Sequence, residues 1–122
     1  MTGRLDHVAL QVRDFDDRVA ALQRLGMTVR RFGVLSSDPS RRIAMLADSR
    51  GFKLELVESG DDGFAHLAFE VESVADAIDG TGLTVDRPPY RLEAARADSA
   101  MLSDPGGLTV QLVRYDPDSP DR

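Results

Sequence analysis

The sequence contains no cysteine, no basic run and no long apolar stretch. The absence of cysteine excludes disulfides, thiolate metal ligands and cysteine nucleophiles, and it fits a reducing compartment. A formal net charge of −6 argues against nucleic acid or an anionic membrane surface as the partner. No stretch approaches a membrane span of about 20 apolar residues, and the start of the chain alternates where a signal peptide would have an unbroken apolar run. We therefore expect a soluble cytoplasmic protein, for which binding of a small molecule remains open.

What the sequence does contain is an internal repeat. The segment LDHVALQV at residues 5–12 returns as FAHLAFEV at residues 64–71, which separates the only two histidines, His7 and His66, by 66 − 7 = 59 residues. Further on the offset becomes 56, and AMLADSRGFKLELV lies over AMLSDPGGLTVQLV. A repeat of this length indicates a duplicated supersecondary unit. Each copy of about 55 to 60 residues would be marginal alone, so the copies are expected to pack together.

The first copy reads as β-α-β-β-β. Its strands are predicted from apolar alternation at residues 5–12, 27–34, 41–46 and 52–57. Asp14 is expected to cap a helix whose apolar positions recur at i, i+4 and i+7 until Gly26. Residues 36–40 are expected to form a polar loop. The helix should cover the apolar face of the first strand, and His7 lies on the other face of that strand.

The second copy follows the same plan. Its strands are predicted at residues 64–71, 83–86, 100–103 and 108–113. Ser73 is expected to cap a shorter helix that ends at Gly80 and Gly82, and two prolines then hold the chain extended before a long loop from Tyr90 to Arg96.

These patterns predict a single domain at residues 1–115. It would consist of a first module at residues 4–58 and a second module at residues 64–115. The remaining residues, 116–122, read DPDSPDR and have the composition of a disordered tail.

Four polar side chains occupy matching places in the two copies. His7 matches His66, and Glu55 matches Gln111, since 111 − 55 = 56. All four are predicted to face away from the apolar layer. Two imidazoles, a carboxylate and an amide oxygen suit a divalent cation such as zinc, nickel, cobalt, manganese or iron(II). A lone histidine on a strand is commonly structural, but the shared register of these two favours a metal site.

The modules, with DHVALQV, KLELVES, AHLAFEV and DPGGLTVQLVRY, resemble the vicinal oxygen chelate superfamily, also called the glyoxalase, bleomycin-resistance and ring-cleaving dioxygenase group. The resemblance spans residues 5–115 and implies a glyoxalase-like α+β fold, with a curved mixed sheet around a central cavity. In metal-using members the ligands come from the first and last strands of each module, which correspond here to His7, Glu55, His66 and Gln111. The last position usually carries glutamate, so Gln111 departs from the pattern. The first helix also lacks the Phe-Tyr pair of glutathione-using glyoxalases, which argues against glutathione.

The resemblance implies chemistry in which two substrate oxygens chelate the metal and an enolate or enediolate develops. Glu55, the only carboxylate in the inferred ligand set, is the candidate general base, and Glu70 is the second choice. Lys53, Arg91 and Arg96 are candidates for binding an anionic group of the substrate. The hypothesis is a metal-dependent lyase or isomerase, similar to glyoxalase I or an acyl-CoA epimerase.

Three rival interpretations share the fold. Bleomycin-resistance-like proteins bind a drug without metal, and they are expected to have an aromatic-rich groove and no histidine pair, whereas aromatics are only 6% of this chain. Fosfomycin-type thiol transferases and ring-cleaving dioxygenases require a carboxylate where Gln111 stands. The resemblance also implies a homodimer, in which each sheet is completed either within one chain or between modules of two chains.

Overall fold

The computed structural model describes residues 3–122, and Met1 and Thr2, which the predicted domain includes, lie outside the described residues. The chain divides into two compact units. The N-terminal unit is His7–Ala65, and the C-terminal unit combines His66–Arg122 with the residues up to Asp6. The division at residues 65 and 66 lies beside the predicted start of the second module, whereas the residues up to Asp6 fall in the C-terminal unit. The module bounds stay predictions. Among the described residues, no helix is long and apolar enough to cross a membrane.

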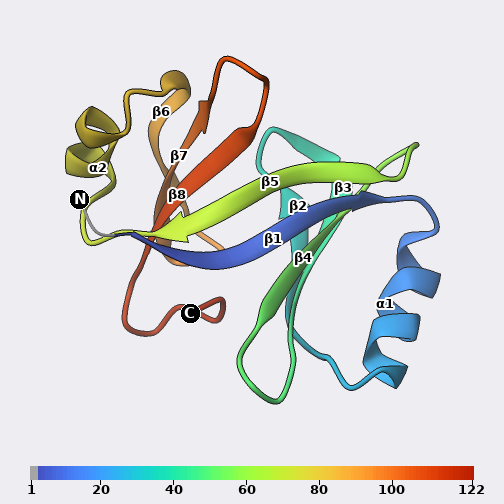
Figure 1. Cartoon of the computed structure of the whole chain (residues 1–122). Helices are drawn as coiled ribbons and strands as arrows, with labels where there is room; N and C mark the ends of the chain where they lie inside the picture. Colours follow the sequence, from blue (N-terminus) through green and yellow to red (C-terminus); the bar gives the residue numbers. More distant parts are fainter. Residues whose placement is uncertain (1–2) are drawn as a thin grey trace. The chain divides into compact units, whose positions relative to one another are not determined.

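The first module has the predicted β-α-β-β-β series (Figure 1), and the first residues of its first strand are grouped with the C-terminal unit. Its elements are β1 (Arg4–Val12), α1 (Phe15–Arg24), β2 (Thr28–Leu35), β3 (Asp38–Ala47) and β4 (Lys53–Glu58). Strand β1 pairs with β4 in parallel, whereas β3 pairs antiparallel with both β4 and β2. The first strand thus lies beside the last strand of its own module.

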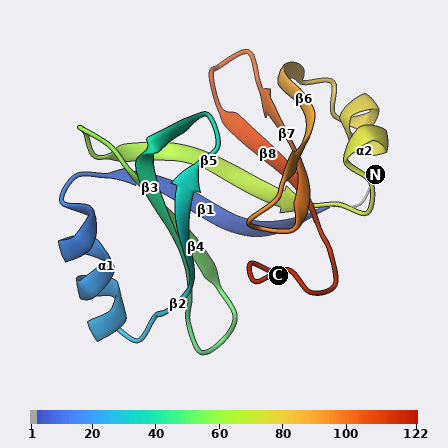
Figure 2. The same cartoon turned by 180° about the vertical axis from the view of Figure 1, so that it is seen from behind.

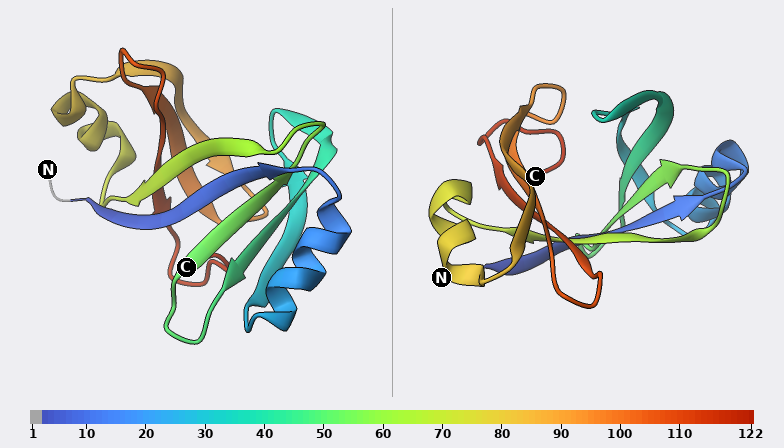
Figure 3. Two further views of the ribbon diagram at one scale, coloured as in Figure 1. Left: turned by 45° about the vertical axis from the view of Figure 1, so that its right-hand side comes forward. Right: turned by 90° about the horizontal axis from the view of Figure 1, so that it is seen from above.

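Helix α1 covers the apolar face of its unit, as predicted. It runs alongside the strands in Figure 3, and its buried Phe15 and Val19 pack in one cluster with Leu46 and Leu56 of the sheet. Leu10 of β1 packs against the same cluster. Burying these side chains stabilises the unit by roughly 1.5–3 kcal/mol each, and it leaves the opposite face of the strands for His7 and Glu55.

The second module repeats this plan, and the first residues of its first strand are grouped with the N-terminal unit. Figure 2 shows its strands with the second helix. Its elements are β5 (Gly63–Glu70), α2 (Val74–Thr81), β6 (Thr84–Leu92), β7 (Ala97–Ser103) and β8 (Thr109–Tyr115). Strand β5 pairs with β8 in parallel, and β7 pairs antiparallel with β8 and β6. Val74 and Ala77 of α2 pack against Leu102 and Leu112.

The strand order across the sheet is β2-β3-β4-β1-β5-β8-β7-β6, which makes an eight-stranded mixed sheet. The expectation of an α+β protein with a mixed sheet and a glyoxalase-like fold is confirmed. The curvature and the central cavity stay predictions.

The two helix starts differ in how they are capped. Ser73 caps α2 as predicted, because its hydroxyl accepts a hydrogen bond from the backbone N–H of Asp76. Gly82 ends α2 with φ 66°, whereas Gly80 lies inside the helix. The prediction for Asp14 was wrong in one respect, because Asp14 has a left-handed backbone (φ 53°) and its side chain makes no capping hydrogen bond.

Two predicted loops are shorter than expected. The loop at residues 36–40 is a turn at residues 36–37, because Asp38 already begins β3 and its carboxylate accepts hydrogen bonds from the backbone N–H and the hydroxyl of Ser40. The prediction of a long loop from Tyr90 to Arg96 was likewise wrong. Strand β6 continues to Leu92. Its two prolines are tolerated because β6 is an edge strand and its pairing with β7 is interrupted between Arg87 and Tyr90, so Pro88 and Pro89 have no ladder partner.

The predicted disordered tail is packed against its unit in the structure. Asp118 forms an ion pair with Arg96 at 2.5 Å, and the Ser119 hydroxyl donates to the carbonyl of Ala95. Asp121 is only 3% exposed. The tail is polar enough to read as disordered, but these specific contacts fix it, and composition cannot reveal such contacts.

Exposed arginine–carboxylate contacts join distant segments of the N-terminal unit. Hydrogen bonds from the Arg42 side chain lower the pKa of Glu58. The backbone N–H of Arg13, together with the Arg18 side chain, lowers the pKa of Asp62. Groups whose pKa is lower in the folded state contribute stability at neutral pH, and that contribution is lost as the pH falls through the folded pKa.

We therefore expect the thermal unfolding midpoint to be lower at pH 3 than at pH 7, with the loss beginning near the ordinary carboxylate pKa of about 4. Thermal unfolding followed by circular dichroism across this range measures it. The Glu58→Gln variant is the control, and it should lose less stability between the two pH values. A midpoint that rises on acidification would contradict this account.

Candidate metal centre

His7 and Glu55 are placed by the parallel pairing of β1 with β4. Ala9 is the Cα partner of Glu55, and His7 precedes Ala9 by two residues, so His7 and Glu55 project from one face. His7 is only 4% exposed. The N-terminal unit therefore brings together the two site residues predicted for its module.

The C-terminal unit holds His66 and Gln111 in the same arrangement. Ala68 of β5 is the Cα partner of Gln111 on β8, and His66 precedes Ala68 by two residues. Ala68 and its counterpart Ala9 are both completely buried. A methyl group at these positions leaves room for the longer neighbouring side chains. Sequence reasoning did not single out these alanines, although they match at the offset of 59.

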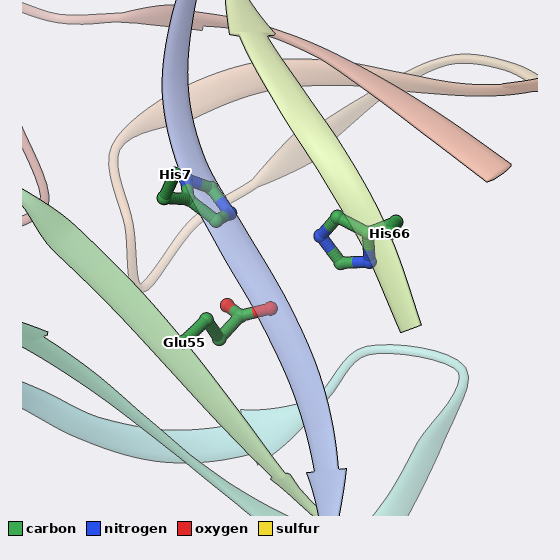
Figure 4. A group of neighbouring side chains, drawn as sticks. All are labelled: His7, Glu55 and His66. Atoms are coloured by element: carbon green, nitrogen blue, oxygen red, sulfur yellow. The ribbon is translucent and has the colours of Figure 1, made fainter. Parts of the chain in front are cut away.

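Three of the predicted residues form one group. His7, Glu55 and His66 each offer a ligand atom, and these atoms all lie within 4.8 Å of one another. Figure 4 shows the two imidazole rings and the carboxylate, which come from β1, β5 and β4. Two imidazole nitrogens and a carboxylate oxygen are ligands that zinc and other first-row divalent cations take in proteins.

Gln111 is held by a side chain that sequence reasoning missed. Its Nε2 donates a 2.9 Å hydrogen bond to the hydroxyl of Ser99, which is completely buried and donates in turn to the Tyr90 hydroxyl at 3.3 Å. The Gln111 Oε1 atom is buried and makes no hydrogen bond with any described residue. A buried amide oxygen without a donor normally costs free energy, so a cation as its partner fits this environment.

The remaining predicted residues lie outside this group. Glu70 accepts two hydrogen bonds from Arg4, at 2.8 and 3.0 Å. Arg91 pairs with Asp116 and Asp98, and these carboxylates raise the pKa of its guanidinium. Their roles in catalysis and substrate binding stay predictions.

Arg96 and Lys53 differ in position. Arg96 lies in the turn before β7 and pairs with the tail residue Asp118. Lys53 is half-buried on β4 and is the Cα partner of His7. Of the cations predicted to bind substrate, Lys53 therefore lies on the strand and face that carry Glu55.

The comparison with family models gives one match. A family model described as "Glyoxalase/Bleomycin resistance protein/Dioxygenase superfamily" matches residues 4–112. No curated protein sequence matches the chain.

Among solved structures, methylmalonyl-CoA epimerase from Mycobacterium tuberculosis is 22% identical, with a TM-score of 0.77 over 93% of this chain and 88% of that chain. The Streptomyces coelicolor methylmalonyl-CoA epimerase in complex with 2-nitronate-propionyl-CoA is 26% identical, with a TM-score of 0.76 over 94% and 99%. A Mn(II)-bound glyoxalase from Novosphingobium aromaticivorans is 18% identical, with a TM-score of 0.66. The match covers 93% of this chain but only 40% of that protein.

Proposed function

Because the chain belongs to the glyoxalase/bleomycin resistance protein/dioxygenase superfamily, we propose that it is a metal-dependent lyase or isomerase acting on a small carbonyl substrate. The observation that carries the proposal is the convergence of His7, Glu55 and His66 within 4.8 Å. The similarity to methylmalonyl-CoA epimerases over most of both chains supports an isomerase-like role. The homodimer and the cytoplasmic location stay predictions.

In this proposal each side chain has a distinct task. His7 and His66 hold the cation through ring nitrogens, and Gln111 presents an amide oxygen whose direction is fixed by the hydrogen bond to Ser99. The bound cation would stabilise negative charge that develops on a substrate oxygen. Glu55 would also hold the cation, and by swinging off it the half-buried carboxylate would take a proton from the carbon next to the substrate carbonyl and return it.

The ligand set also bears on one rival. Two histidines and one carboxylate form the facial triad of non-haem iron(II) oxygenases, and homoprotocatechuate 2,3-dioxygenase from Arthrobacter globiformis has a TM-score of 0.70 with this chain. However, this chain spans only 40% of that enzyme's length. The amide of Gln111 further disfavours this rival, because the resemblance implies a carboxylate ligand at this position in a ring-cleaving dioxygenase. Oxygen-dependent cleavage of catechols by iron(II)-loaded protein would favour the rival.

The metal content of the purified protein tests the proposal. We expect about one first-row divalent cation per chain by elemental analysis of protein prepared without chelator or a histidine tag, with zinc, nickel, cobalt, manganese and iron measured together. The His7→Ala/His66→Ala double variant should lose it, because a single carboxylate and an amide oxygen hold such cations weakly.

The control separates metal loss from unfolding. Circular dichroism should show the same secondary structure for both proteins. If the wild type is metal-free and gains no thermal stability from added nickel, zinc, cobalt or manganese, the proposal fails. A metal-independent protein that binds antibiotics or other small molecules would then be the better account. Active preparations should be screened with 2-oxo thiohemiacetals and acyl-CoA epimers.

A further inference from the structure

A row of side chains crosses the N-terminal unit on the face that carries Glu55. Read from the Cα partners of neighbouring strands, the row consists of Arg31, Met45, Glu55 and Ala9. Partner residues on adjacent strands project from the same face, so Arg31 shares a face with Glu55. Two strand spacings, about 10 Å, separate their backbones. Arg31 is half-buried, and its guanidinium can therefore approach a group that is bound beside Glu55.

The C-terminal unit contains the equivalent row. Its members are Arg87, Met101, Gln111 and Ala68. The two arginines differ by 87 − 31 = 56 positions, which is the offset that relates Glu55 to Gln111. The duplication has therefore kept an arginine in line with a site residue in both modules.

The two arginines nevertheless have different surroundings. Arg87 stacks on the Tyr90 ring, with 3.5 Å between its Cζ atom and the ring centroid. Gly33 is the residue of the first module that corresponds to Tyr90. Tyr90 pairs with Ser99 and Gly33 pairs with Ile43, and these two partners are related by the same offset, 99 − 43 = 56. The Nη1 atom of Arg31 occupies the space where a Cβ atom on residue 33 would stand. The glycine thus lets the Arg31 guanidinium fold down over the sheet.

We propose that Arg31 is a specificity-determining residue that binds an anionic oxygen group, a carboxylate or a phosphate, on the substrate of the metal site. This inference rests on the proposed function, because it assigns the anionic arm of a substrate whose carbonyl lies at the cation. An arginine fork matches a carboxylate or phosphate with two parallel hydrogen bonds. Lys53, on the same face and next to His7 in register, adds positive charge to that side.

Two pairs of chelators test the proposal with protein loaded with cobalt(II), whose visible absorption reports chelation. Kojic acid and comenic acid chelate through the same hydroxypyranone and differ by a hydroxymethyl group against a carboxylate. Acetohydroxamate and phosphonoacetohydroxamate provide the corresponding comparison for a phosphate-like group. In each pair, we measure how much more tightly the anionic member binds.

The preference for the anionic member should fall about tenfold in Arg31→Gln for at least one pair, because a charge-assisted hydrogen bond is lost. The pair that responds identifies whether the arm is a carboxylate or a phosphate. Gly33→Ala should lower the preference by a smaller factor, because the added methyl group displaces the guanidinium without removing its charge.

Arg30→Gln is the matched control, because Arg30 is the exposed neighbour of Arg31 on β2. It changes the net charge by the same amount and should leave both preferences unchanged. Equal losses in Arg30→Gln and Arg31→Gln would reduce the effect to long-range charge and overturn the proposal, as would unchanged preferences in Arg31→Gln.

The failure of the two proposals can be told apart. If no chelator alters the cobalt spectrum of the wild type, the metal site itself fails, and the inference falls with it. If the neutral chelators bind the wild type and all variants equally, the metal site stands, and only the anionic preference decides whether Arg31 has the proposed role.

Discussion

The Glu55→Gln variant is expected to keep its metal and lose turnover by about 10²- to 10⁴-fold, which is the usual contribution of a positioned general base. Glutamine keeps an oxygen that can face the cation, as is proposed for the Gln111 amide in the other module, but it cannot take up a proton. Steady-state kinetics on the substrate found among hemithioacetals and acyl-CoA epimers measures the loss, with elemental analysis on the same samples.

Gln111→Glu is the matched control for this variant. It places a carboxylate at the equivalent position of the second module. Ser99, whose hydroxyl now accepts from Gln111 and donates to Tyr90, can turn its proton to that carboxylate. We expect tighter metal binding from the added negative charge, without the turnover loss of Glu55→Gln. If Glu55→Gln turns over substrate at the wild-type rate, Glu55 is not the base. If neither metal affinity nor turnover responds to Gln111→Glu, position 111 does not contact the cation.

The Leu56→Ala variant is expected to lower the free energy of unfolding by about 2–5 kcal/mol. Leu56 is 1% exposed and packs in the cluster that joins α1 to the sheet. Truncating it removes buried apolar surface and leaves a cavity beneath the helix. Urea unfolding followed by circular dichroism measures the change through the shift of the midpoint at constant slope.

Leu25→Ala provides the comparison for Leu56→Ala, because Leu25 is 81% exposed at the end of α1. This substitution removes the same atoms from a side chain that is already in water, and it should change the free energy of unfolding by less than about 0.5 kcal/mol. Equal effects of the two substitutions would mean that the cluster beneath α1 does not carry the stability of its unit.

Much of the fold was predictable because its signals are local. Alternation along residues 5–12 separates the Leu10 face from the His7 face without reference to any other strand. The i, i+4, i+7 spacing from Phe15 predicts α1 in the same way. The 59-residue offset then relates His7 to His66, and it identified His7, Glu55 and His66 as candidates, although the offset alone does not bring residues of two modules together.

The neighbours of these residues were harder to predict because they depend on pairings between distant strands. A bulge in β2 shifts the pairing from Val29 with Leu46 to Arg31 with Met45. Val29 packs on the helix side, so simple alternation would place Arg31 there as well. The bulge instead places Arg31 on the face of Glu55, and no local sequence pattern predicts such an inserted residue.

The sequence by itself determined the element types, the two faces of each strand and the residues that could bind a cation, because periodicity and duplication are written along the chain. Only the tertiary structure decided which contacts fix those residues. It directs the Gln111 amide by way of Ser99 and places the Arg31 guanidinium over Gly33. Such contacts either join residues that are far apart in the sequence or depend on a bulge that moves a residue to the other face of the sheet. They form only when the strands pair.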